Sequence, residues 1–310
     1  MMYFLSCEKE ENGGGVYAYH LTENGTLEER GYFACDRPMY ALKCEKGLCV
    51  LLRQPFADSE FSGYFFIGND LKTATEIKST QGKVACHLAV DGDAVYTVNY
   101  LSGNLVKNGT HIAQREGKSV HSTRQTEPHT HFVCKTPDGY FAVCDLGTDT
   151  LAIYDCDLRL FSEAKVPDGY GIRHLIFSND GKFIYAVNEL VPSVSVFTYK
   201  KGKAKLVETI KIDCQHEKAN GAAIRLSKDG KTLYASVREE NAVAVYKVNG
   251  AALTHLQTLP CGGDSPRDIE VCEDYLVCAN ERSGNVTVYD LKKGVFTAEL
   301  ALKNALCCVK

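Results

Sequence analysis

Short apolar runs with alternating polar positions recur along the second half of the chain, and each run ends on an aromatic residue. Four such segments align without gaps, at residues 140–154, 183–197, 232–246 and 275–289. Their closing aromatics, Tyr154, Phe197, Tyr246 and Tyr289, are spaced by 43, 49 and 43 residues. Apolar–polar alternation is typical of β-strands, and a repeat of this length is typical of arrays in which each unit is one small sheet.

An Asp-Gly pair precedes three of these segments, at residues 138–139, 180–181 and 229–230. Between two runs rich in β-forming residues, this dipeptide is a strong signal for a hairpin. Each unit therefore contains a strand, an Asp-Gly turn, a second strand, a polar turn, a third strand and a weaker fourth one. This order predicts one four-stranded blade of a β-propeller.

Fainter copies of the unit occur earlier, at residues 88–100, 63–69 and 16–21. Dividing 310 residues by a mean repeat of about 44 gives seven blades. We therefore predict an all-β, seven-bladed β-propeller of antiparallel blades, with residues 1–310 in a single domain. The runs 2–5 and 16–21 are expected to close the ring with the C-terminal strands. Helical periodicity is nowhere sustained, which disfavours a doubly wound α/β fold.

Composition narrows the possible partners. The chain is 45% hydrophobic and 24% charged, which is ordinary for a globular protein. A net charge of −4 argues against binding to nucleic acid or to a membrane surface. No segment approaches the ~20 apolar residues that span a bilayer, and the first residues do not form a basic leader. We expect a cytoplasmic protein that is a monomer or a weak homo-oligomer.

The fourteen cysteines are scattered, and no two of them form a Cys-x-x-Cys pair. In a cytosolic chain this pattern favours reduced, buried thiols that behave as small hydrophobic residues. We therefore expect neither disulfides nor a metal site, and no cofactor.

Superposition of the blades predicts that two sets of positions meet at one mouth of the central channel. The first set lies at the start of each innermost strand and comprises His87, His131, Arg173, Ala222 and Arg267. The second set lies at the end of each second strand and comprises Tyr100, Leu146, Glu189, Arg238 and Glu281. Charged groups that converge on a concavity are suited to hold a small anion, and arginine binds phosphate or carboxylate bidentately. The alternative is that these polar residues only solvate the rim.

Five pieces of sequence at these positions resemble the lactonase family of seven-bladed propellers, whose typical members are bacterial 6-phosphogluconolactonases. The pieces are residues 127–131, 143–149, 171–175, 185–190 and 265–268. The most specific of them continues a stretch that starts at Arg124, Arg-Gln-Thr-Glu-Pro-His-Thr-His. The sequence departs from the family pattern at Ile172, where the family has proline, at Asp268, where it has histidine, and in a shorter segment at 106–120.

The resemblance implies a catalytic set. A fungal branch of the family cyclises carboxymuconate with a His, two Arg and a Glu, and these match His131, Arg173, Arg238 and Glu189 here. The implied reaction is hydrolysis of 6-phospho-D-glucono-1,5-lactone to 6-phosphogluconate, a step of the pentose phosphate pathway. Glu189 or His131 is expected to be the base, with Arg173 and Arg238 stabilising charge on the carbonyl oxygen.

The remaining polar residues at this mouth are expected to bind the substrate, a small anionic sugar lactone. They are His87, His129, Arg267, Tyr100 and Glu281. Other functions stay open: muconate cycloisomerisation, hydrolysis of an unphosphorylated lactone, or a non-catalytic propeller that serves as a binding platform, because the fold does not fix the function.

Overall fold

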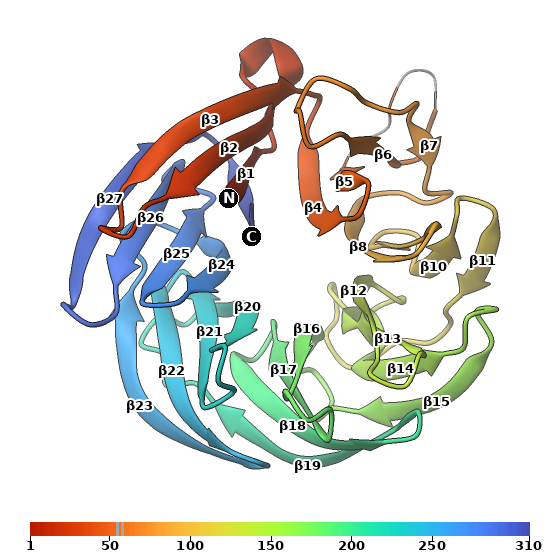
Figure 1. Ribbon diagram of the computed structural model, residues 1–310. Helices are drawn as coiled ribbons and strands as arrows, with labels where there is room; N and C mark the ends of the chain where they lie inside the picture. Colours follow the sequence, from red (N-terminus) through yellow and green to blue (C-terminus); the bar gives the residue numbers. More distant parts are fainter. Residues whose placement is uncertain (54–55, 57–58) are drawn as a thin grey trace.

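The repeating unit forms one blade of a ring. The computed structural model describes residues 1–53, 56 and 59–310, and in this part of the chain seven four-stranded antiparallel sheets surround a central channel (Figure 1). Each aligned segment folds into the second and third strands of its blade, and each Asp-Gly pair makes the turn between the first and second strands. The predicted fold class is confirmed.

Blades 2 to 7 follow the chain from the innermost strand outward. Blade 2 contains β4 (Pro38–Cys44), β5 (Gly47–Leu52), β6 (Gly63–Ile67) and β7 (Lys78–Ser79). Blade 3 contains β8 (Ala85–Asp91), β9 (Ala94–Asn99), β10 (Asn104–Lys107) and β11 (His111–Gln114). Blade 4 contains β12 (Thr130–Lys135), β13 (Phe141–Asp145), β14 (Thr150–Tyr154) and β15 (Leu160–Lys165). Blade 5 contains β16 (Ile172–Phe177), β17 (Phe183–Asn188), β18 (Ser193–Lys200) and β19 (Lys203–Lys211). Blade 6 contains β20 (Asn220–Leu226), β21 (Thr232–Arg238), β22 (Ala242–Asn249) and β23 (Ala252–Pro260). Blade 7 contains β24 (Pro266–Cys272), β25 (Tyr275–Asn280), β26 (Asn285–Asp290) and β27 (Val295–Ala301).

Blade 1 is assembled from both ends of the chain. Its strands are β28 (Ala305–Val309), β1 (Met2–Ser6), β2 (Gly15–Leu21) and β3 (Leu27–Ala34), in this order from the channel outward. β28 pairs with β1, with Tyr3 opposite Val309 and Leu5 opposite Cys307, and the two termini lie side by side in Figure 1. The prediction that the N-terminal runs close the ring with a C-terminal strand is confirmed.

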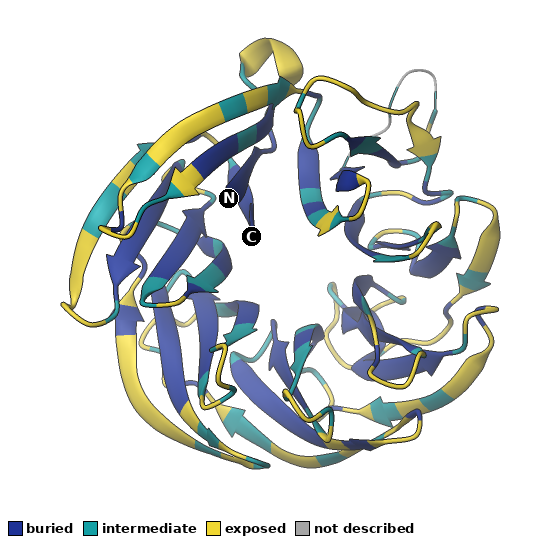
Figure 2. Ribbon diagram, viewed as in Figure 1, coloured by how far each residue is buried: buried dark blue, intermediate teal, exposed yellow. Residues whose placement is uncertain are grey.

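The core lies between the blades. The inner strands are buried almost throughout, whereas the outermost strands alternate between exposed and partly buried residues (Figure 2). Aromatic side chains bridge neighbouring blades; for example, the rings of Tyr96 and Phe141 stack with centroids 3.7 Å apart. Such buried apolar area stabilises the fold by roughly 25 cal/mol per Å². Two short 3-10 helices, Glu10–Asn12 and Leu146–Thr148, complete the described elements, and none of the described helices is long and apolar enough to cross a membrane.

A bulge near the start of the innermost strand recurs in blades 2 to 7. In each of them the pairing with the second strand shifts register and leaves a residue of the first strand without a direct partner. These residues are Met39, Cys86, His131, Arg173, Ala222 with Ala223, and Arg267. Because a bulge bends the strand and redirects a side chain, it is suited to build a site at the end of a sheet.

Candidate active site

Four of the bulged residues and the residues that follow the second strands of blades 2, 3 and 5, together with the last residue of β21, line one cavity at the channel mouth. Its volume is about 270 Å³. It is lined by Met39, Arg53, Val84, Cys86, Tyr100, Arg124, His131, Glu189, Arg238 and Arg267. Members of both sets predicted from the repeat therefore converge here, and five of the nine predicted site residues line this cavity.

Glu189 is the centre of the polar network. It follows the last residue of β17, and its backbone N–H donates to the carbonyl oxygen of Gly171 at 2.7 Å. Its side chain accepts from Arg173 Nε at 2.9 Å and from Arg124 Nη2 at 2.6 Å, and it forms an ion pair with Arg238, whose Nη2 lies 3.3 Å from Oε2. Glu189 is 4% exposed, and burial alone would favour the neutral acid. The surrounding arginines outweigh that effect and hold the pKa of its carboxyl well below the usual range.

Arg173 is the most enclosed of these arginines. Its side chain is buried, and Nη1 donates to the carbonyl oxygen of Ala222 in the neighbouring blade. Burial lowers the pKa of its guanidinium to about 10, so the group stays charged at neutral pH. Glu189 and Ala222 together fix this cation in one orientation beneath the mouth.

His131 differs from its neighbours because its imidazole bonds to no other side chain among the described residues, although its ring lines the cavity. It is 8% exposed. Burial and the nearby Arg173 hold the pKa of His131 well below its usual value, so the ring is neutral at physiological pH. A neutral imidazole facing a cavity is ready to accept a proton.

Cys86, the bulged residue of β8, contributes a thiol to the same wall. Burial raises its pKa to about 11, so the thiol stays protonated and is a poor nucleophile. The mouth therefore favours activation of water over covalent catalysis by this cysteine.

Three predicted residues form the rim. The Tyr100 hydroxyl accepts from Arg124 at 3.1 Å, and Arg267 Nη1 donates to Glu281 at 3.0 Å. His129 lies behind the cavity wall, where its ring stacks on Tyr100 with centroids 4.3 Å apart and Nδ1 donates to the Tyr100 carbonyl oxygen at 2.9 Å. His129 thus supports Tyr100 and does not line the mouth.

The predicted alignment is wrong by one residue at His87. Cys86 occupies the bulge of β8, which is the position that corresponds to His131 in blade 4. His87 is directed deeper into the channel, where its ring lies between Tyr40 (3.9 Å between centroids) and Phe132 (4.1 Å). An unpaired residue in the bulge shifts the side chains that follow it, and a gap-free alignment does not register this shift.

Sequence reasoning missed Arg53 and Arg124 as site residues. Arg53 directly follows β5, as Glu189 directly follows β17, and both line the cavity. Arg53 therefore belongs to the set of positions at the ends of the second strands. It was not predicted because the repeat is too faint in blade 2 to align. Arg124 lies outside the repeat, in the segment between β11 and β12. The available signal was its place at the start of the motif that ends at His131.

Asp268 explains one departure from the family pattern. Its carboxylate accepts from Arg225 Nη2 at 2.8 Å and from the backbone N–H of Cys308 at 3.0 Å. The aspartate therefore joins blade 7 to blade 6 and to the closing strand β28. Among the residues the structure describes, no group of three or more His, Cys, Asp or Glu is arranged to hold a metal ion.

Comparison with known proteins relates this geometry to a family. A family model for the lactonase, 7-bladed beta-propeller matches residues 2–301. A protein of Lactobacillus plantarum of known structure superposes with a TM-score of 0.89 at 26% identity, covering 99% of this chain and 98% of that one. A candidate 6-phosphogluconolactonase from Bacteroides fragilis superposes with a TM-score of 0.87 at 25% identity, covering 99% and 96%. An uncharacterised protein of Staphylococcus aureus (strain MSSA476) is 30% identical over 94% of this chain and 92% of its own.

Proposed function

The chain belongs to the lactonase family of seven-bladed β-propellers, and from this premise we propose that it hydrolyses 6-phospho-D-glucono-1,5-lactone to 6-phosphogluconate. One observation carries the proposal: a neutral His131 faces a cavity in which Glu189 holds buried arginines in place. Lactone hydrolysis needs a base for water and cations for the developing oxyanion, and this arrangement supplies both.

The charge at the mouth supports a phosphorylated substrate. Five arginines (Arg53, Arg124, Arg173, Arg238 and Arg267) surround two carboxylates (Glu189 and Glu281) in and beside the cavity. Three positive charges therefore remain uncompensated among these groups, which suits a phosphate dianion. The Bacteroides fragilis neighbour is described as a candidate for the same activity.

His131 acts as the base in this scheme, because its imidazole is neutral and unengaged. It takes a proton from water while the water oxygen attacks the lactone carbonyl carbon. The ring C–O bond then breaks, and the imidazolium returns the proton to the departing alkoxide. The product is the open hydroxy acid, which ionises in water.

Arg238 and Arg173 stabilise the negative charge that develops on the carbonyl oxygen. Arg238 lines the cavity, and its Nη2 pairs with Glu189, so its guanidinium is held beside the bound lactone. Glu189 is a poor base because several cations stabilise its anionic form. Its role is to orient Arg173 and Arg238.

The test is a direct assay of acid release from freshly prepared 6-phosphogluconolactone and from glucono-1,5-lactone, each corrected for spontaneous hydrolysis. We expect catalysis of the phosphorylated lactone at a higher kcat/KM, and a loss of about 10²- to 10⁴-fold in kcat for His131→Gln. His255→Gln, at an exposed histidine of β23, is the matched control. Rates no higher than the spontaneous one with both lactones would refute the proposal.

A further inference from the structure

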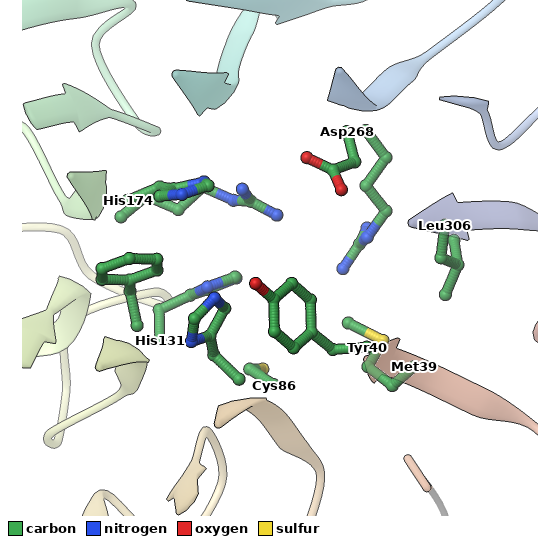
Figure 3. A pocket seen from close by; sticks show the side chains of 11 residues that line it. Met39, Tyr40, Cys86, His131, His174, Asp268 and Leu306 are labelled. Carbon is green, nitrogen blue, oxygen red and sulfur yellow. The ribbon is translucent and has the colours of Figure 1, made fainter. Parts of the chain in front are cut away.

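A small cavity lies directly beneath the mouth, in the middle of the channel (Figure 3). Its volume is about 30 Å³, which is enough for one water molecule. It shares Met39, Cys86, His131 and Arg267 with the larger cavity above, so the two adjoin along a common wall. A group held in this cavity would thus approach the substrate from below.

Tyr40, on β4, directs its hydroxyl into this cavity (Figure 3). The hydroxyl makes no hydrogen bond to the residues that the structure describes. Burial raises the pKa of Tyr40 well above its usual value, so the group stays a neutral O–H that can both donate and accept.

His87 offers a second unused donor beside Tyr40. The backbone N–H of Val133 donates to its Nδ1 at 3.5 Å, and burial keeps the ring neutral by lowering its pKa well below the usual value. The ring proton therefore lies on Nε2. That nitrogen is buried without a partner in the described structure, an arrangement that costs free energy unless water or a ligand satisfies it.

We infer that this central cavity holds the hydrolytic water, with Tyr40 and His87 as positioning residues that hold it next to His131. The inference rests on the proposed function. The water donates one proton to His131, and its oxygen forms the new bond to the lactone carbonyl carbon. Cleavage of the ring C–O bond and return of the proton to the alkoxide complete the balance, and no other reactant is needed.

If the nucleophile comes from this small cavity and not from bulk solvent, the products formed in dilute methanol should show it. Methanol can make the same hydrogen bonds only if the cavity also admits its methyl group, whereas a nucleophile arriving through the open mouth could be water or methanol. We therefore expect wild-type protein in dilute methanol to yield the free acid alone, after subtraction of the uncatalysed methyl ester. Enzyme-dependent formation of methyl ester in the proportion of the uncatalysed reaction would overturn the inference.

Tyr40→Phe tests the positioning role because it removes a single hydroxyl. We expect kcat to fall about tenfold while KM stays within about twofold, because the lost contact is to water and not to the lactone. Tyr234→Phe, at a buried tyrosine of β21 away from the channel, is the matched control for stability and activity. A kcat unchanged by Tyr40→Phe would count against the assignment.

His87→Ala supplies the complementary result. The enlarged cavity should admit methanol, so methyl ester should appear although wild type forms none. If His87→Ala also yields only acid at a normal rate, the cavity does not select the nucleophile and the inference fails. These outcomes differ from failure of the proposed function, in which wild-type protein hydrolyses neither lactone.

Discussion

Arg124 and Glu189 lie 65 residues apart in the sequence, yet Arg124 Nη2 donates to Glu189 Oε1 at 2.6 Å across the channel mouth. The Arg124 side chain is 38% exposed, far more than those of Arg173 and Arg238, which bind the same carboxylate. It also contacts the Tyr100 hydroxyl. Arg124 is therefore the cation of this network that an incoming anion reaches first.

Replacing Arg124 should distinguish a phosphorylated from an unphosphorylated lactone. Charge-assisted hydrogen bonds contribute about 1.5–3 kcal/mol, so Arg124→Gln should lower kcat/KM for the phosphorylated lactone about 10- to 100-fold. The loss should be smaller for glucono-1,5-lactone. Arg282→Gln, at a more exposed arginine paired with Glu239 and Asp264, is the control. Equal losses on both substrates would show that Arg124 does not contact the phosphate.

Removal of the Glu189 charge should destabilise the fold. Glu189→Gln leaves a buried cluster of arginines without its anion, and breaking such a pair costs about 3–5 kcal/mol. We expect a corresponding decrease in the free energy of unfolding, measured by urea denaturation at neutral pH. An unchanged value would mean that the arginines find other partners when the carboxylate is absent.

The same carboxylate should make stability depend on pH. Its folded-state pKa lies well below the ordinary value of 4.5, so the unfolded chain binds a proton more readily than the folded one. The stabilising contribution is complete above about pH 4.5 and decreases as pH falls toward the folded-state value. The unfolding free energy of Glu189→Gln should therefore change less with pH below 4.5 than that of wild type. Parallel curves for the two proteins would contradict this expectation.

Protonation of His131 should determine the pH below which kcat/KM decreases. Because burial holds its pKa well below 6.5, the ring stays a base as pH is lowered through that value. We expect kcat/KM to stay level through pH 6.5 and to fall only in more acidic solution. Steady-state assays across the pH range check this, and a decrease with its midpoint near 6.5 would point to a solvated histidine as the base.

Asp268 and Arg225 should be coupled in stability. Asp268→Ala leaves Arg225 with Glu270 as its one remaining carboxylate partner among the described residues and deprives the Cys308 N–H of its acceptor. We expect a loss of about 3–5 kcal/mol, and partial recovery in the Arg225→Met/Asp268→Ala double variant because the buried cation is gone. A double-mutant cycle by urea denaturation measures the coupling, and strictly additive losses would show that the two side chains act independently.

The sequence predicted the ring and part of the mouth because both follow from the repeat. Glu189 and Arg238 occupy equivalent positions of successive blades, so aligning the aromatic runs was sufficient to bring them together. That they bind substrate stays a prediction.

The remaining parts of the mouth do not follow from periodicity. Arg124 belongs to a connecting segment whose path depends on tertiary contacts, such as the Gln125 side chain donating to the Leu146 carbonyl oxygen at 2.8 Å. His87 was misplaced because a bulge changes side-chain direction without changing the apolar pattern. Tyr40 belongs to blade 2, whose faint copy of the repeat was found only at residues 63–69 and does not include β4.

The closing blade also determines when the protein can finish folding during synthesis. β1 is made well before its inner partner β28, and synthesis of the chain between them takes about 15–60 s at ordinary elongation rates. Over that time β1 presents an unpaired inner edge, and blades 2 to 7 can form without a closed ring between them. An unpaired strand edge is a template for pairing with another chain. Nascent chains should therefore be most prone to associate with one another just before residues 305–309 emerge, and premature termination there should yield aggregates and not a smaller propeller.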